Sequence, residues 1–200
     1  MFRRLLAVLT IAATALVIPG SAHAGKTYSG EGDQVVRIRT TKTPGLLTFT
    51  HDGEANFIVT AVNPAGKMED LLVNEIGPYE GTVLYNGNGT SKGIAALEIK
   101  ADGAWTAVFK PVSAARCWCA ATIRGVGDQV LKLSPTRGLR TVRAVHSGEA
   151  NFIVQSYTRV GTYGDLLFNE IGGYRGKALL PAGTRLVTVK ADGSWTLQRR

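Results

Sequence analysis

The sequence has few cysteines and, after its first 24 residues, no long hydrophobic run. Only two of its 200 residues are cysteine, which is too few for a fold held together by disulfides. No stretch beyond residue 24 supplies the roughly 20 apolar residues that a membrane-spanning helix needs. A Gly-x-Ser-x-Gly sequence occurs once, over residues 89–93, but no helical pattern follows it, and a nucleophile turn requires a strand that leads into a helix. A series of spaced acidic calcium ligands does not occur. With 44% hydrophobic and 19% charged residues, the composition is nevertheless that of a globular protein.

The first 24 residues have the three parts of a secretory signal peptide. Arg3 and Arg4 supply the positive start, an apolar run follows them, and a small-residue cleavage site ends at Ala24. A membrane anchor is the alternative, but the apolar run is shorter than a bilayer-spanning helix. We therefore predict a cleaved signal peptide over residues 1–24 and a secreted, extracellular chain of residues 25–200 without a transmembrane segment.

The rest of the sequence contains two copies of one pattern. Residues 53–59, Gly-Glu-Ala-Asn-Phe-Ile-Val, recur as residues 148–154 at an offset of 95, whereas the later motif Lys-Ala-Asp-Gly recurs at an offset of 90. The first copy thus carries five extra residues, in the turn-rich stretch 86–90. Such a long period indicates duplicated domains rather than a solenoid. The predicted units are a signal peptide (1–24), a first repeat (25–112), a joint (113–124) and a second repeat (125–200).

Within each copy, hydrophobic residues alternate with polar ones. Leu47, Phe49 and His51 fall on one face of a predicted strand, and Trp105 and Ala107 fall on one face of another. Glycine turns separate these strands, and no helical periodicity follows residue 24. About seven short strands per copy predict an all-β fold of two tandem antiparallel β-sandwich, jelly-roll-like repeats. A closed barrel is the alternative.

The most suggestive polar residues surround a predicted two-residue hairpin turn. If Asp52 and Gly53 form this turn, His51 and Glu54 become neighbours across the hairpin, and the same holds in the second copy. Such a pair can bind a cation, contact sugar hydroxyls or transfer protons, but it can equally be structural. One histidine per copy is few for zinc, which takes three or four protein ligands. We predict no metal, no cofactor and no catalytic residue.

Other polar and aromatic residues recur near this turn. An Asn-Glu pair precedes a tyrosine between glycines, and an exposed tyrosine can stack on a sugar ring. The tryptophans are interpreted as core, and Asp33 and Asp128 as turn residues. The predicted ligand-binding residues are His51, Glu54, Asn56, Asn74, Glu75 and Tyr79 in the first repeat, and His146, Glu149, Asn151, Asn169, Glu170 and Tyr174 in the second.

Cys117 and Cys119 lie in the joint, with one residue between them. In an extended strand both sulfurs point to one side, where a bond between them is strained. A secreted chain nonetheless tends to oxidise exposed thiols. An intramolecular disulfide, an intermolecular one and two buried thiols therefore stay open.

The net charge of +8 is divided unevenly between the repeats. Residues 30–112 hold seven basic and ten acidic side chains, whereas residues 125–200 hold eleven basic and five acidic ones. The basic repeat could meet an anionic envelope surface, such as teichoic or phospholipid phosphates, or the acidic repeat itself. A nucleic-acid partner is disfavoured, because basic and aromatic residues do not interleave and the expected compartment is extracellular.

Four motifs occur in the same order in both copies. They are Gly-x-Gly-Asp, His-x-Gly-x-x-Asn-Phe, Asn-Glu-Ile-Gly-x-Tyr-x-Gly and Ala-Asp-Gly-x-Trp. This pattern, which covers residues 25–200, resembles secreted actinobacterial proteins built from tandem small β-sandwich repeats. The resemblance implies the fold and the extracellular location but no activity.

From these features we predict an exported, non-catalytic binding module of the cell envelope that recognises carbohydrate or another wall polymer. One alternative is a metal-dependent envelope hydrolase that uses the paired His and Glu residues. Another is a structural module that associates with other proteins through its sheet edges.

Overall fold

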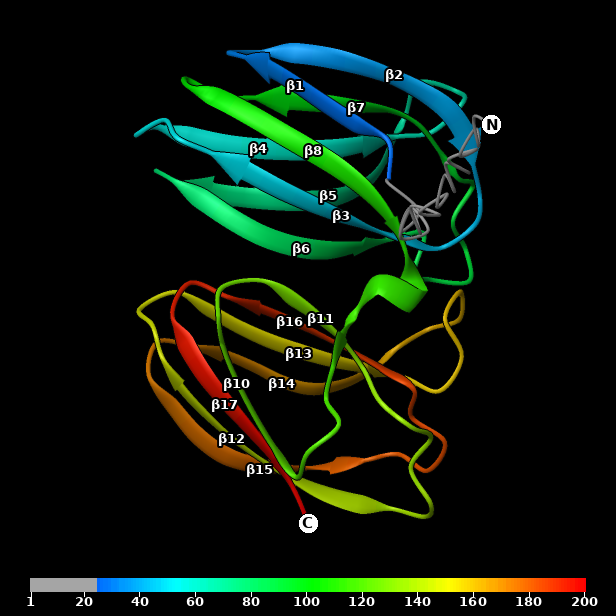
Figure 1. Ribbon diagram of the computed structural model, residues 1–200, viewed down its shortest axis with the longest axis vertical. Helices are drawn as coiled ribbons and strands as arrows, with labels where there is room; N and C mark the ends of the chain where they lie inside the picture. Colours follow the sequence, from blue (N-terminus) through cyan, green and yellow to red (C-terminus); the bar gives the residue numbers. More distant parts are fainter. Residues whose placement is uncertain (1–24) are drawn as a thin grey trace, which may run out of the picture.

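The computed structural model describes residues 25–200, so the predicted signal peptide over residues 1–24 lies outside the described part of the chain. The described chain consists mainly of β-strands, with one short 3-10 helix, η1, between the repeats. Figure 1 shows the strands grouped into two sandwiches stacked along the long axis of the molecule. No helix among residues 25–200 is long and apolar enough to cross a membrane.

Each sandwich contains eight strands. Those of the first repeat are β1 (Thr27–Glu31), β2 (Gln34–Thr41), β3 (Gly45–His51), β4 (Asn56–Val62), β5 (Met68–Ile76), β6 (Tyr79–Tyr85), β7 (Ile94–Lys100) and β8 (Ala104–Pro111). The connection holds η1 (Val112–Ala114) and β9 (Arg116–Cys117). Those of the second repeat are β10 (Thr122–Val126), β11 (Gln129–Lys132), β12 (Arg140–Ser147), β13 (Asn151–Tyr157), β14 (Asp165–Ile171), β15 (Tyr174–Leu180), β16 (Leu186–Ala191) and β17 (Ser194–Arg199).

The strands of each repeat form two antiparallel sheets that face each other. Their orders are β1-β8-β3-β6 and β2-β7-β4-β5 in the first repeat, and β10-β17-β12-β15 and β14-β13-β16-β11 in the second. The short β9 adds a parallel strand beside β11. This shared order is that of an eight-stranded jelly roll. The predicted all-β sandwich fold is therefore confirmed, with eight strands per repeat where about seven were expected, and the barrel alternative does not form.

The turn at Asp52 and Gly53 is not a two-residue hairpin, so that prediction is wrong. The turn joins β3 to β4, which lie in opposite sheets of the sandwich. His51, at the end of β3, pairs instead with Tyr79 and Trp105 on the neighbouring strands of its own sheet. Local sequence does not separate the two cases, because a hairpin and an inter-sheet turn both favour Gly and Asp where the chain reverses.

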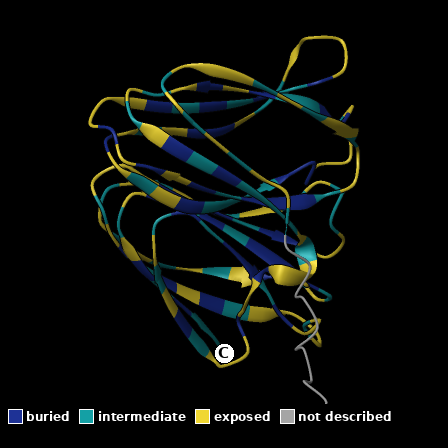
Figure 2. Cartoon of the chain, turned by 45° about the horizontal axis from the view of Figure 1, so that its top comes forward, coloured by how far each residue is buried: buried dark blue, intermediate teal, exposed yellow. Residues whose placement is uncertain are grey.

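Buried side chains line the inner faces of the strands with the expected period of two. Leu47, Phe49 and His51 on β3 are all buried, and so are Trp105 and Ala107 on β8. In Figure 2, buried and exposed stretches alternate along individual strands. The two sandwiches have separate hydrophobic cores, as expected for duplicated domains.

A third hydrophobic cluster joins the two repeats. Leu84 of the first repeat packs there with Val130 and Tyr157 of the second. The extra residues of the first copy lie beside this cluster, where the carbonyl oxygen of Gly87 accepts a hydrogen bond from the N–H of Gly161 at 3.1 Å. The insertion in the first repeat therefore contacts the second repeat. We call this contact region the junction.

Candidate functional site

The predicted ligand residue His51 belongs to the protein interior. Its side chain is buried, and its ring stacks on Phe57 with the centroids 4.5 Å apart. Nδ1 lies 3.0 Å from the carbonyl oxygen of Gly77. Because a carbonyl oxygen only accepts, Nδ1 carries a proton and donates it. Nε2 faces Oδ1 of Asp102 at 3.3 Å. The imidazole is thus held inside the sandwich, away from any ligand in solvent.

Asp102 links this imidazole to the turn that follows it. Its Oδ2 accepts hydrogen bonds from the backbone N–H groups of Glu54 and Ala55, both at 2.9 Å. The N–H groups of Ala55 and Glu54 hold the pKa of the Asp102 carboxyl below its ordinary value. The carboxylate that faces His51 is therefore that of Asp102, which corrects the predicted pairing of His51 with Glu54. We call this arrangement the histidine latch.

The second repeat repeats the latch atom for atom. The ring of His146 stacks on Phe152, and its Nδ1 donates to the carbonyl oxygen of Gly172 at 2.8 Å. Nε2 lies 3.4 Å from Oδ1 of Asp192, whose Oδ2 accepts from the N–H of Glu149 at 2.7 Å. Such a repeated, internally bonded unit fixes the end of each sandwich.

The other predicted ligand residues do not gather at one point. The exposed members are Glu54, Asn56, Asn74, Glu149, Asn151 and Asn169. The partly buried members are Glu75, Tyr79, Glu170 and Tyr174. Asn56 and Asn74 lie on β4 and β5, in the sheet opposite that of His51. Of the whole set, Glu75 and Tyr79 are those that the structure places at the junction.

Tyr79 connects the two repeats through Asp128. Its hydroxyl donates to Oδ2 of Asp128 at 2.8 Å, while Oδ1 accepts from the N–H of Ala191 at 2.9 Å. Beside this bond, the N–H of Thr82 donates to the carbonyl oxygen of Asp128 at 2.9 Å. Asp128 is only 3% exposed. Both partners thus serve the junction, and the sequence had indicated only a turn at Asp128 and a ligand contact at Tyr79.

Three carboxyl groups around the junction lie in poorly solvated surroundings. Burial raises the pKa of Asp128, and it also raises the pKa of Glu75 and of Asp70. The charge of Asp128 raises the pKa of Glu75 further, while Lys190 opposes all three shifts. Burial and the adjacent Asp128 likewise raise the pKa of Tyr79, so its hydroxyl stays protonated and able to donate.

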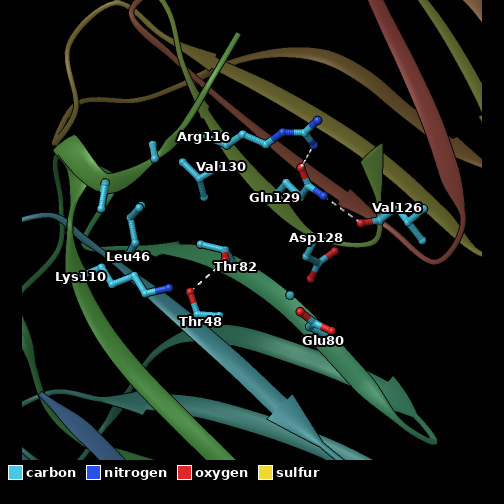
Figure 3. Close-up of a pocket in the computed structure, with 13 residues that line it drawn as sticks. Leu46, Thr48, Glu80, Thr82, Lys110, Arg116, Val126, Asp128, Gln129 and Val130 are labelled. Carbon is cyan, nitrogen blue, oxygen red and sulfur yellow. Dashed lines mark hydrogen bonds between the residues drawn. The ribbon is translucent and has the colours of Figure 1, made fainter. Parts of the chain in front are cut away.

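A cleft of about 560 Å³ opens between the repeats next to the Tyr79–Asp128 hydrogen bond, and Figure 3 shows the side chains that line it. Its floor is the outer face of β3, β6 and β8, and its walls come from the connection and from β10 and β11. The lining side chains that Figure 3 labels are Leu46, Thr48, Glu80, Thr82, Lys110, Arg116, Val126, Asp128, Gln129 and Val130. The Thr48 and Thr82 hydroxyls are 2.9 Å apart, and Arg116 donates to Oε1 of Gln129 at 2.6 Å.

The matching face of the second repeat, on the sheet β10-β17-β12-β15, is open and positively charged. It forms a hollow of about 410 Å³ whose lining, within the described part of the chain, includes four cationic side chains and no acidic one. The four are Arg124, Arg143, Arg175 and Lys177. The first repeat carries Ser29, Thr48, Glu80 and Thr82 at the corresponding positions. Equivalent faces of the two repeats therefore differ in both chemistry and shape.

Cys117 and Cys119 are joined by a disulfide in the connection. Trp118 between them is 1% exposed and packs into the core of the second repeat. The guanidinium of Arg199 lies 4.8 Å above the Trp118 ring and donates to the Trp118 carbonyl oxygen at 2.8 Å. The disulfide loop thus holds a tryptophan that has no counterpart in the first copy.

Within residues 25–200, no group of three or more His, Cys, Asp and Glu side chains is placed to hold a metal ion. Neither the comparison with protein-family models nor that with curated proteins found a match for this chain. The cleft is therefore the candidate site on geometric grounds. Sequence reasoning missed it, because Thr48, Lys110 and Gln129 carry no motif of their own and meet only when the repeats pack.

Proposed function

We propose that this protein is an exported, non-catalytic binding module of the cell envelope, and that it holds a carbohydrate or related wall polymer in the cleft between its repeats. The observation that carries the proposal is the cleft itself. Its volume of about 560 Å³ lies within the usual range for ligand pockets, and clefts between domains are common binding sites.

The lining of the cleft suits a polyhydroxylated ligand. Sugar hydroxyls both donate and accept hydrogen bonds, so they need partners of both kinds. Thr48 offers a hydroxyl, Glu80 offers a carboxylate that accepts, and Lys110 offers an ammonium that donates. Leu46 and Val130 supply apolar surface against which the C–H faces of a sugar ring can pack. Among residues 25–200, no aromatic side chain lines the cleft, so recognition there would rest on hydrogen bonds rather than on ring stacking.

A binding role fits these groups better than catalysis does. The two carboxyl groups at the cleft are those of Glu80 and Asp128. Both oxygens of Asp128 already accept hydrogen bonds, from Tyr79 and from Ala191, so this carboxyl is committed to the junction. The histidines that a hydrolase would use are buried in the latches. Export is supported by the signal-peptide pattern and by the Cys117–Cys119 disulfide, because disulfides persist in oxidising compartments.

The test is a retention assay on insoluble peptidoglycan, chitin and cellulose, with Thr48→Arg as the blocking variant. Arg143 occupies the equivalent position in the second repeat, so the fold accommodates an arginine there. The long side chain should fill the cleft and reduce retention on the bound polysaccharide at least tenfold. The matched control is Arg143→Thr, which makes the reciprocal exchange on the open face and should leave retention unchanged.

Two results would overturn this proposal. One is that no polysaccharide retains the wild-type protein above an unrelated protein of similar charge. The other is that Thr48→Arg and Arg143→Thr behave alike. Release of soluble sugar fragments from a retaining polymer would contradict the non-catalytic role and favour the hydrolase.

A further inference from the structure

At the junction, the two repeats contact each other through different surfaces of their shared fold. The first repeat contributes β5 and β6, and the second contributes the face formed by β11, β13 and β16. Because both repeats have the same fold, each also carries the surface that the other uses. The second repeat therefore presents an unused copy of the β5–β6 surface, and the first presents an unused copy of the β11–β13–β16 face. A contact of this head-to-tail kind does not close on itself and can extend from one molecule to the next.

The two unused surfaces carry the counterparts of both residues that form the side-chain hydrogen bond of the junction. At the junction, Tyr79 of the first repeat donates to Asp128 of the second. The corresponding residues are Tyr174 and Asp33. Asp33 already accepts from the N–H of Ala101, as Asp128 does from Ala191, so it is oriented in the same way. Its second oxygen forms no hydrogen bond with the described part of the chain, and neither does the Tyr174 hydroxyl.

The hydrophobic partners are present as well, and they are exposed. Leu84 and Val130 pack together in the cluster that joins the repeats. Their counterparts are Leu179, which is 58% exposed, and Val35, which is 65% exposed. A partner that covers these two side chains would remove apolar surface from water, which is favourable. The known junction shows how a second copy would cover both.

The charged residues at the two unused surfaces are complementary. At the junction, Asp70 lies near Lys190, and the matching pair is Asp165 with Lys100. Glu80 shares the cleft with Val126. Their counterparts, Arg175 and Glu31, have opposite signs. A contact between molecules would thus keep one charge pair of the junction and gain another. It would also bring the basic repeat of one molecule against the acidic repeat of the next.

We propose that this protein self-associates head to tail, with the β14–β15 surface of one copy docking on the β2–β4–β7 face of the next in the geometry of the internal junction. The occupant of each surface is a second copy of this chain. Leu179, Tyr174 and Asp165 form the donor surface, and Val35, Asp33 and Lys100 form the acceptor surface. The contact lacks the inserted residues 86–90 and the covalent connection, so it is weaker than the internal one and depends on protein concentration.

The test is sedimentation velocity of the chain of residues 25–200 over a wide concentration range, without polysaccharide. The wild type should shift to larger species as concentration rises, and high salt should reduce this shift. Leu179→Asp blocks the donor surface and Val35→Asp blocks the acceptor surface. Each should weaken association by about 30-fold or more, because each places a charge in an apolar contact. Ile171→Asp is the matched control, since Ile171 is 81% exposed but its counterpart Ile76 is also exposed rather than buried at the junction.

Mixing the two blocked variants gives the decisive measurement. Leu179→Asp retains an intact acceptor surface and Val35→Asp retains an intact donor surface, so an equimolar mixture should form heterodimers and nothing longer. Circular dichroism melts establish that each variant is folded. The proposal is overturned if the wild type stays monomeric at all concentrations. It is also overturned if Ile171→Asp weakens association equally, or if the mixture behaves as the sum of two monomers. If self-association is refuted in this way, the proposed function of the cleft still stands or falls by its own retention assay, because that assay concerns different residues.

Discussion

Replacing Tyr79 with phenylalanine tests whether the Tyr79–Asp128 hydrogen bond holds the two repeats together. The change removes one hydroxyl and leaves the ring, which packs against Phe57, in place. The lost bond is 2.8 Å long and reaches the carboxyl group of Asp128, a residue that is 3% exposed, so the change leaves a largely desolvated acceptor with one donor fewer. Hydrogen bonds to charged groups contribute about 1.5–3 kcal/mol, and a desolvated acceptor left without a partner places the loss toward the upper part of this range.

Tyr174→Phe is the matched control for this experiment. Tyr174 occupies the same place in the second repeat, and its ring packs on Phe152 in the same way. Its hydroxyl forms no hydrogen bond within residues 25–200. The control should therefore change the free energy of unfolding by less than about 0.5 kcal/mol at protein concentrations too low for self-association.

The assay is urea unfolding at neutral pH, followed by circular dichroism, for the wild type and both variants. We expect Tyr79→Phe to lower the free energy of unfolding by about 1.5–3 kcal/mol, or to separate a single transition into one for each repeat. A double-mutant cycle with Asp128→Asn should show a coupling energy of about 1 kcal/mol or more. Equal effects of Tyr79→Phe and Tyr174→Phe would refute the reasoning, because only one of the two hydroxyls contacts the other repeat.

Three further changes probe the junction, the disulfide loop and a latch. Burial raises the pKa of Asp128 in the folded state, so this group stabilises the fold most below about pH 4, and its contribution is lost as the pH rises through the raised pKa. Asp128→Asn should therefore flatten the fall in stability above pH 4, and an unchanged slope would contradict this. Trp118→Ala should cost about 3–5 kcal/mol in urea unfolding, and a loss below about 1 kcal/mol would show that the loop is not part of the core. The pKa of Asp102 is lowered in the folded state, so this group stabilises the fold at neutral pH and its contribution is lost as the pH falls. Asp102→Asn should therefore reduce the thermal midpoint at neutral pH and have little effect once acid has protonated the wild-type carboxyl. Equal losses at both pH values would count against the latch.

The fold class follows from the sequence because its signals are local. A period of two along residues such as Leu47, Phe49 and His51 specifies one buried face, and glycine turns limit the length of each strand. Because the pattern is duplicated, each strand is predicted twice, from two different stretches of sequence. The order of strands in the sheets is not local, and this is why the turn after His51 looks like a hairpin although it crosses between sheets.

The candidate site depends on contacts between residues far apart in the chain. The partner of His51 is Asp102, which reaches it from the turn between β7 and β8. No spacing rule links these two residues, although both belong to motifs that recur in the second copy. The cleft depends on how two folded repeats pack, which no pattern within one repeat encodes. Two signals in the sequence do point to an asymmetric packing of the repeats: the five-residue insertion occurs only in the first copy, and Glu80 and Arg175 differ in charge within an otherwise shared motif.

The shared tyrosine shows how one motif can serve both the fold and an interface. The ring of Tyr174 packs against Phe152 and Phe168 inside its own repeat, and phenylalanine would make the same contacts. Core packing therefore explains an aromatic residue at this position but not its hydroxyl. In the first repeat, the hydroxyl of the equivalent residue, Tyr79, donates a hydrogen bond to Asp128 of the second repeat. In the second repeat, no further repeat follows within the described chain, and the equivalent of Asp128 is Asp33 at the other end of the molecule. A second copy would bring these two groups together, which accounts for the one part of Tyr174 that packing within its repeat leaves unexplained.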